Sequence, residues 1–212
     1  MATYDLEEQE KLIQLKDWWK RHGGLVLTTI TLALLVVAGV RYWTQHKSNQ
    51  AAEASVIYGE MLKAAESRET KKVADLSGTL LEQYPSTIYA SLGALITAKV
   101  HFESGDLKTA QAQLQWVSEK ARDEAMQALG RVRLAQVQID QKAYDEALKT
   151  LEGEHPAAFG SRFAELRGDV YVAQGKKAEA RSAYQSALAL IPEKERLARE
   201  LLQFKLDALG AA

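Results

Sequence analysis

The stretch Gly23 to Val40 reads GGLVLTTITLALLVVAGV and contains eighteen residues without a charged side chain. As a helix it would be roughly 27 Å long, which matches the hydrocarbon thickness of a bilayer. Aromatic and basic side chains, which favour the membrane–water interface, flank it on both sides. A buried helix of a soluble core rarely has such a collar at both ends. The sequence therefore predicts a transmembrane anchor over residues 23–43, with seven interface residues: Trp18, Trp19, Lys20, Arg21, Arg41, Tyr42 and Trp43.

Basic residues near the span indicate its orientation. Four Lys or Arg residues lie shortly before the apolar stretch Gly23–Val40 and two lie shortly after it. Because the side richer in Lys and Arg stays in the cytoplasm, we expect a cytoplasmic stub over residues 1–22 and a domain over residues 44–212 on the far side of the membrane. Tyr42 and Trp43 stand where a signal-peptide cleavage site would need small residues. The segment is thus expected to remain as an uncleaved anchor.

The stub itself has a helical pattern, with Leu12, Leu15 and Trp19 on one face among charged residues. Two interpretations remain open. The stub either lies along the membrane surface and runs into the span, or it binds a cytoplasmic partner.

Composition excludes several function classes. Beyond residue 50 the chain has 21 basic and 23 acidic residues, a balance that argues against a nucleic-acid partner. The chain has no cysteine, so it has neither disulfides nor thiolate metal sites. The histidines are scattered, and no nucleophile motif or phosphate-binding glycine loop is present. We therefore predict no catalytic site, metal or cofactor; the four histidines are His22, His46, His101 and His155.

The domain after residue 48 is rich in residues that form helices well, mainly Ala, Leu, Gln, Glu and Lys. Its three prolines, Pro85, Pro156 and Pro192, each stand where a helical pattern ends. Single glycines mark short turns. This pattern predicts an all-α fold with helices of about 12 to 17 residues. Residues 51–66 and 71–84 form the first expected helix pair, and residues 193–209 form a last helix that caps the domain with a polar outer face.

A set of spacings recurs along this domain. Residues Gly168, Tyr171, Ala180, Tyr184, Ala187 and Pro192 lie 3, 9, 4, 3 and 5 positions apart. The same spacings begin at Ala98, with His101, Ala110, Leu114 and Val117, and at Ala135, with Gln138, Ala147 and Leu151. They resemble the tetratricopeptide repeat, in which small residues let two helices cross closely. The sequence thus predicts a transmembrane helix followed by a tetratricopeptide-repeat-like helical solenoid.

In such a solenoid the first helix of each repeat lines the concave surface. Repeat spacing predicts a partner-binding face that runs from apolar to charged; an apolar patch there could hold an unfolded segment or a partner helix. The alternative is that its apolar residues only pack against the preceding helices. The predicted face consists of Leu92, Leu95, Lys99, Phe102, Leu129, Val132, Gln136, Ile139, Arg162, Glu165 and Asp169.

Six stretches carry a resemblance over nearly the whole chain. They are WWKRHG (18–23), GVRYW (39–43), RLAQVQ (133–138), EALKTL (146–151), LRGD (166–169) and AEARSAY (178–184). In these the chain resembles the YfgM family, the ancillary subunits of the bacterial SecYEG translocon.

The resemblance implies a single-pass protein of the bacterial inner membrane with a periplasmic repeat domain. It further implies a non-catalytic scaffold at the SecYEG translocon that works with a membrane-anchored, PpiD-like periplasmic chaperone and helps newly exported polypeptides. A second function remains open, in which the protein sequesters or regulates a stress-response regulator. Besides the lipid bilayer, the expected partners are therefore proteins.

Overall fold

The computed structural model describes the backbone of residues 2–210 and the side chains of residues 8–210. The chain divides into two compact units, Met1–Asn49 and Gln50–Ala212. Helix α1 (Ala2–Glu66) accounts for the described part of the first unit and supplies the first helical segment of the second.

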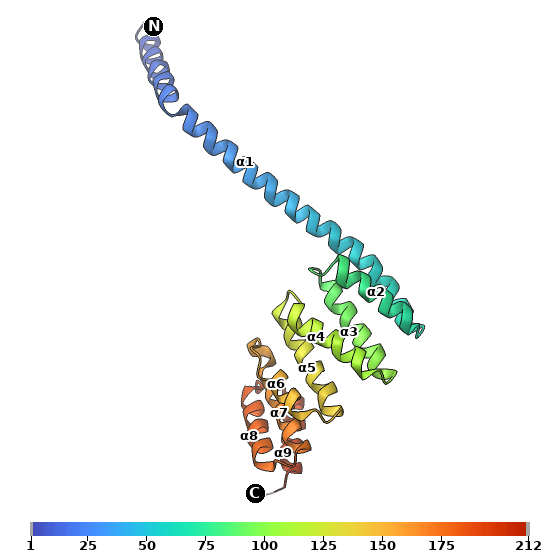
Figure 1. The fold of residues 1–212 in the computed structure, drawn as a ribbon. Coiled ribbons are helices and arrows are strands. Elements are labelled where there is room, and N and C mark those ends of the chain that lie inside the picture. Colours follow the sequence, from blue (N-terminus) through green and yellow to red (C-terminus); the bar gives the residue numbers. More distant parts are fainter. Residues whose placement is uncertain (1, 211–212) are drawn as a thin grey trace. The chain divides into compact units, whose positions relative to one another are not determined.

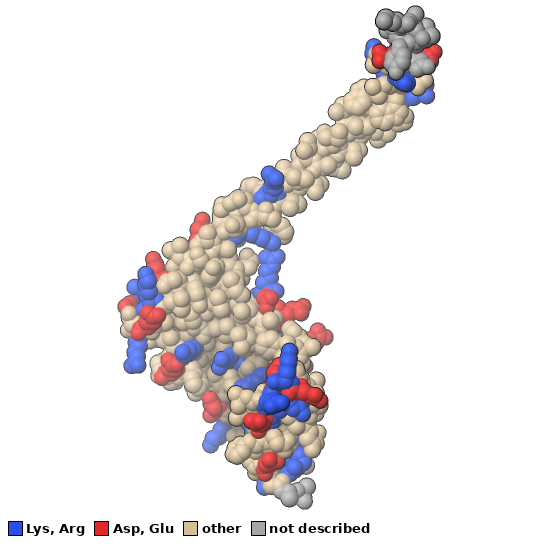
Figure 2. Space-filling model, turned by 180° about the vertical axis from the view of Figure 1, so that it is seen from behind, with Lys and Arg blue, Asp and Glu red and all other residues tan. Residues whose placement is uncertain are grey.

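In the first unit, α1 carries an apolar window with a mean hydropathy of 2.3. Only 6% of that window is buried, so its side chains are turned outward like those of a helix in lipid. Figure 2 shows a length of helix without acidic or basic atoms between basic side chains at its two ends. In the described part of the chain, α1 is the one helix long and apolar enough to cross a membrane.

The polar side chains within the apolar window are satisfied inside the helix. The hydroxyls of Thr28, Thr29 and Thr31 each donate to a backbone carbonyl four residues earlier, at 2.8 to 2.9 Å. A hydroxyl bonded in this way does not need water, so it is compatible with the hydrocarbon region.

The second unit is a stack of helices joined by short turns (Figure 1). No strand occurs among residues 2–210, which confirms the predicted all-α class. After α1, the elements are α2 (Thr70–Gln83), α3 (Ile88–Glu103), α4 (Leu107–Lys120), α5 (Glu124–Asp140), α6 (Tyr144–Thr150), the short 3-10 helix η1 (Ala157–Phe159), α7 (Gly160–Ala173), α8 (Lys177–Leu190) and α9 (Arg196–Ala208).

Turn chemistry sets several of these boundaries. Gly105 and Gly175 have φ values of +84° and +75°, a conformation that glycine adopts without steric cost after a helix. Asp106 then caps α4 by accepting the backbone N–H of Thr109 at 3.1 Å. The hydrogen bonds from Thr109 hold the pKa of Asp106 below its usual range, with a smaller contribution from His101. The cap therefore works best with Asp106 ionised.

The repeat spacings correspond to close helix crossings. Gly168 on α7 lies against the ring of Tyr184 on α8, and a Cβ at position 168 would overlap that ring. The small residues at the equivalent positions of the other repeats, Ala98 and Ala135, are buried. Small residues at these points thus set the approach of neighbouring helices, as expected for a repeat solenoid.

Three boundaries differ from the sequence prediction. Residues 51–66 are the end of α1 rather than a separate helix, because helix-forming residues continue unbroken from the apolar window. Helix α6 has seven residues, since Gly153 and Pro156 follow it closely. Helix α9 begins at Arg196 because Pro192 starts a turn, in which the N–H of Glu195 donates to its carbonyl at 3.0 Å.

The prediction of a polar outer face on the last helix is wrong. Leu197, Leu201 and Phe204 are 71%, 61% and 74% exposed on α9. On the opposite side, Leu202 and Leu206 are buried against α7 and α8. The helix therefore caps the stack with one apolar side and presents a second one outward.

Candidate functional site

An open groove of about 730 Å³ lies between α3 and α5 of the second unit. Leu92, Leu95 and Phe102 line it from α3, and Leu129 lines it from α5. Phe102 is 39% exposed, so part of its ring is free to contact another molecule. A hollow of this size with apolar walls has the dimensions of a ligand or peptide pocket.

The bottom of the groove is tied into the core. Ala98, Leu114 and Val137 are buried, and they belong to one cluster of packed side chains. At one end Tyr58 of α1 lies in tilted contact with Tyr89, with ring centroids 5.6 Å apart. Burial raises the pKa of Tyr58, with a smaller contribution from Tyr89, so its phenol stays neutral at physiological pH. The walls are therefore held by packed residues and not by a loop.

Charged side chains of both signs border the groove: Lys99, Glu103, Arg133 and Asp140. Lys99 and Glu103 form an exposed ion pair at 3.8 Å. Exposed pairs of this kind contribute little to stability, so they can exchange partners with an incoming segment at small cost. The groove thus combines an apolar lining with a mixed polar border, the composition found in many protein–protein interfaces.

The structure brings together six of the predicted concave residues: Leu92, Leu95, Lys99, Phe102, Leu129 and Gln136 all line the groove. Val132 and Ile139 do not line the groove. Val132 is 5% exposed in the core, and Ile139 packs against the same cluster.

The residues next to these two in sequence, Arg133 and Asp140, face the groove instead. They were missed because the repeat spacing of 37 residues leads from Leu95 and Phe102 to Val132 and Ile139. A helical spacing of 4, 3 and 4 from Leu129 reaches Arg133, Gln136 and Asp140, and it could have identified them.

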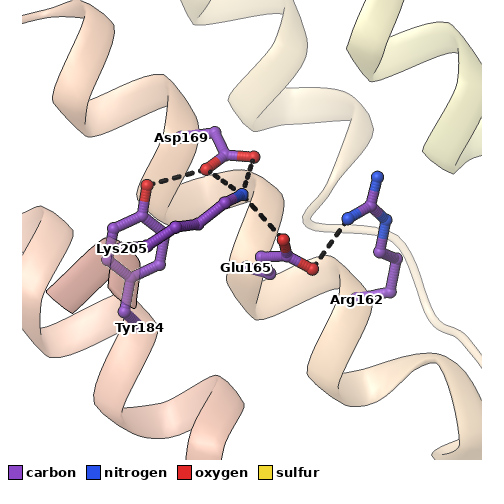
Figure 3. A network of polar contacts seen from close by, with 5 residues as sticks. All are labelled: Arg162, Glu165, Asp169, Tyr184 and Lys205. Atoms are coloured by element: carbon purple, nitrogen blue, oxygen red, sulfur yellow. Dashed lines mark hydrogen bonds and ion pairs between the residues drawn. The ribbon is translucent and has the colours of Figure 1, made fainter. Parts of the chain in front are cut away.

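The last three predicted residues, Arg162, Glu165 and Asp169, come together elsewhere, in an ion network on α7 (Figure 3). Lys205 of α9 donates to Glu165 Oε1 and Asp169 Oδ1, both at 2.7 Å, and to Asp169 Oδ2 at 2.9 Å. Arg162 donates to Glu165 Oε2 at 2.7 Å. These side chains are engaged by the last helix and do not line the groove.

Tyr184 completes the network from α8, because its hydroxyl donates to Asp169 Oδ1 at 2.7 Å. Burial and this hydrogen bond raise the pKa of Tyr184 far above its ordinary value. Burial opposes the ionised form of Glu165, yet hydrogen bonds from Lys205 and Arg162 hold its pKa below the usual range. The network therefore holds α9 on α7 and α8.

The residues predicted to lie at the membrane–water interface are on the exposed surface of α1. Trp18 and Trp19 are each 48% exposed before the apolar window, and Tyr42 and Trp43 are exposed after it. The ammonium of Lys47 lies 3.5 Å from the ring centroid of Trp43. Such a cation–π pair suits a headgroup environment, where the ring and the charge both find partners.

Among the described residues, no group of three or more His, Asp or Glu side chains is arranged to hold a metal ion. The helical stack, the apolar window and the groove together define a class of protein: membrane-anchored proteins with tetratricopeptide-like repeats. A family model described as a tetratricopeptide repeat-like domain matches residues 16–211.

Relatives with a common description extend this class to a family. An "Ancillary SecYEG translocon subunit" of Neisseria gonorrhoeae is 34% identical over 210 residues, which cover 99% of this chain and 100% of the relative. Proteins of the same description from Haemophilus influenzae and Escherichia coli are 32% and 27% identical, covering 87% and 99% of this chain and 90% and 100% of those relatives. The chain belongs to this non-catalytic family, which confirms the resemblance to YfgM.

Proposed function

We propose that this protein is a membrane-anchored scaffold at the SecYEG translocon, where it works with a PpiD-like, membrane-anchored chaperone to assist newly exported proteins. The orientation is the one expected from the basic residues, with residues 1–22 in the cytoplasm and the repeat domain in the periplasm. The relatives' description as translocon subunits supports the location.

The observation that carries the proposal is the groove between α3 and α5. It has an apolar lining and a half-exposed phenylalanine, and its walls are fixed by the core. An apolar segment of the chaperone, or of an exported polypeptide before it folds, can bury its side chains there. The charged border limits non-specific binding of purely apolar surfaces, because such a surface would strip water from the charged side chains without replacing their hydrogen bonds.

Anchoring lets such a groove act without tight binding. A site confined to the membrane near the translocon meets emerging chains at a high effective concentration, so a weak complex is enough. Weak binding also allows the groove to release the exported polypeptide, which must keep moving through the translocon.

Site-specific photo-crosslinking in intact cells tests this function. A crosslinker at Phe102 should trap the chaperone or exported chains, while a crosslinker at Gln185, on the exposed side of α8, serves as the control. A crosslinker at Leu12 examines the stub. Partners trapped only through Leu12 would contradict the proposal and support the regulatory function instead.

Protease treatment of spheroplasts tests the orientation. Residues after the span should be digested while the membrane is intact. Protection of the repeat domain until lysis would exclude a periplasmic scaffold.

A further inference from the structure

Helix α9 presents an apolar face that the groove does not explain. Leu197, Leu201 and Phe204 follow one another at intervals of four and three residues, so they lie on one side of the helix. Leu197 and Phe204 are the two most exposed large apolar side chains among residues 50–210. A surface of this kind on a folded domain usually marks an interaction site.

The orientation of this face is fixed by the opposite side of the helix. Leu202, Leu206 and Leu209 pack into a cluster with residues of α7 and α8, and Lys205 joins the ion network described above. Arg199 donates to the carbonyls of Leu188 and Ile191, at 3.1 and 2.9 Å, at the end of α8. The helix therefore cannot rotate to bury its outer face within the chain.

Charges along one edge of α9 indicate what can cover this face. Arg196, Glu200 and Asp207 are exposed on the same edge, with the basic residue in the first turn and Asp207 in the last. Among the described residues, Arg196 makes no ion pair, and Asp207 accepts only a hydrogen bond from Gln203 of its own helix. The two ends of the edge thus carry opposite charges, and Glu200 lies between them.

Such an edge is complementary to itself when two copies run antiparallel. With a twofold axis near Leu201, the register places Leu197 of one copy opposite Phe204 of the other and brings the two Leu201 side chains together. Equal edges meet in antiparallel helices, so Arg196 of one copy lies beside Asp207 of the other, twice by symmetry. In a parallel pairing this edge would instead face the other edge of the partner helix, so Arg196 and Asp207 would not meet.

We propose that the outer face of α9 binds a second copy of this chain, through an antiparallel contact between the two α9 helices. The contact is isologous and small, because three apolar side chains from each copy form its centre. It is therefore weak for molecules free in solution. Two copies anchored in one membrane meet at a much higher effective concentration, which makes a weak contact sufficient.

Disulfide crosslinking of the full chain in proteoliposomes, where the copies share one membrane, tests this proposal. The natural sequence has no cysteine, so a single introduced residue reports on its own position. Leu201→Cys lies at the twofold axis and should give a disulfide-linked dimer several times more abundant than Ala112→Cys, an exposed position on α4. Equal crosslinking of the two variants would overturn the proposal.

A second set of variants separates α9 from any other contact between copies. Leu197→Gln with Phe204→Gln, added to Leu201→Cys, leaves the buried side of α9 intact and should reduce crosslinking to the control level. Persistent crosslinking would mean that another surface brings the copies together, and this would refute the assignment.

Charge reversal tests the antiparallel register. Arg196→Asp or Asp207→Arg alone should weaken dimer formation roughly tenfold, since each change affects both symmetric pairs. The double variant should restore it, and failure of this rescue would contradict the register.

Two other occupants of the face give distinct results. Quenching of a fluorophore at L201C by brominated lipids in proteoliposomes, without crosslinking, would assign the face to the membrane surface. Protection of L201C from maleimide in native membranes, but not in the purified protein, would assign it to a different protein. Either result would overturn the proposal.

Discussion

The repeats around α3 and α5 and those around α7 and α8 share their spacing but differ in what covers their first helices. In the first region Leu92, Phe102 and Leu129 remain available in an open groove. In the second region, Glu165 and Asp169 of α7 are engaged by Lys205 of α9. One repeat architecture therefore provides a binding surface in one place and a closed end in another, depending on the next helix.

The two regions should also differ in whether their side chains contribute mainly to folding stability or to partner binding. The groove region contains exposed side chains whose removal costs the fold little, whereas the closed end depends on tight packing and on half-buried charges. Substitutions at the closed end should change stability, and substitutions in the groove should change binding.

The largest effect is expected for Gly168→Ala. The added Cβ would overlap the ring of Tyr184, which is buried and hydrogen-bonded to Asp169, so the ring has little room to move. Overpacking of this kind costs about 1–3 kcal/mol of unfolding free energy. Urea denaturation of the full chain in detergent, followed by circular dichroism, measures the loss.

Gly78→Ala is the matched control, because a Cβ at position 78 of α2 would have no neighbour within 4 Å. Alanine favours a helix over glycine, so this variant should be as stable as the natural chain or gain up to about 1 kcal/mol. Similar losses in both variants would show that the close approach of α7 and α8 is unimportant.

A smaller effect is expected for Lys205→Met. The methionine keeps most of the apolar stem but leaves Glu165 and Asp169 without their shared cation. Because these groups are only partly shielded from solvent, we expect a loss of about 1–2 kcal/mol. Lys99→Met, which breaks an exposed pair with Glu103 in the groove region, should change stability by less than about 0.5 kcal/mol in the same denaturation assay. Equal losses of unfolding free energy in the two variants would contradict the division between a closed end that controls stability and a groove that controls binding.

Much of the architecture could be predicted from sequence because its signals are local. The apolar stretch 23–40 and the spacing from Gly168 to Tyr184 each act within a few helical turns. In the structure the first becomes an exposed apolar helix and the second a close helix crossing.

The face of a helix is harder to predict because it depends on neighbours far away in sequence. Repeat spacing predicts Val132 and Ile139 on the concave surface, yet they pack in the core while Arg133 and Asp140 border the groove. Likewise, nothing local distinguishes Glu165 as a partner of Lys205, forty residues later. The apolar outer face of α9 was missed for the same reason. The sequence pattern alone does not show whether one or two faces of this helix are apolar.

Acid should weaken the closed end through Glu165. Its pKa is lower in the folded chain than its ordinary value of 4.5, so the unfolded chain binds more protons in the window between these values. The stability that it contributes is complete above about pH 4.5 and is lost as the pH falls through the folded pKa. Glu165→Gln should therefore show a shallower loss of unfolding free energy below pH 4.5 than the natural chain. The same acid slope in both proteins would mean that other carboxylates account for it.

A small effect on stability, and the clearest separation of binding from folding, is expected for Phe102 in the groove. Phe102→Gln removes a ring that is already partly in water, so the unfolding free energy should change by less than about 1 kcal/mol. Co-purification of the chaperone or of exported chains in mild detergent should fall, because the ring is the most accessible apolar group of the groove. Val132→Ala provides the contrast, since Val132 lies in the core next to the groove lining. It should lower stability by about 1–2 kcal/mol while the folded fraction binds normally. If instead Val132→Ala abolishes binding in the folded protein and Phe102→Gln leaves it intact, the recognition surface lies outside the groove.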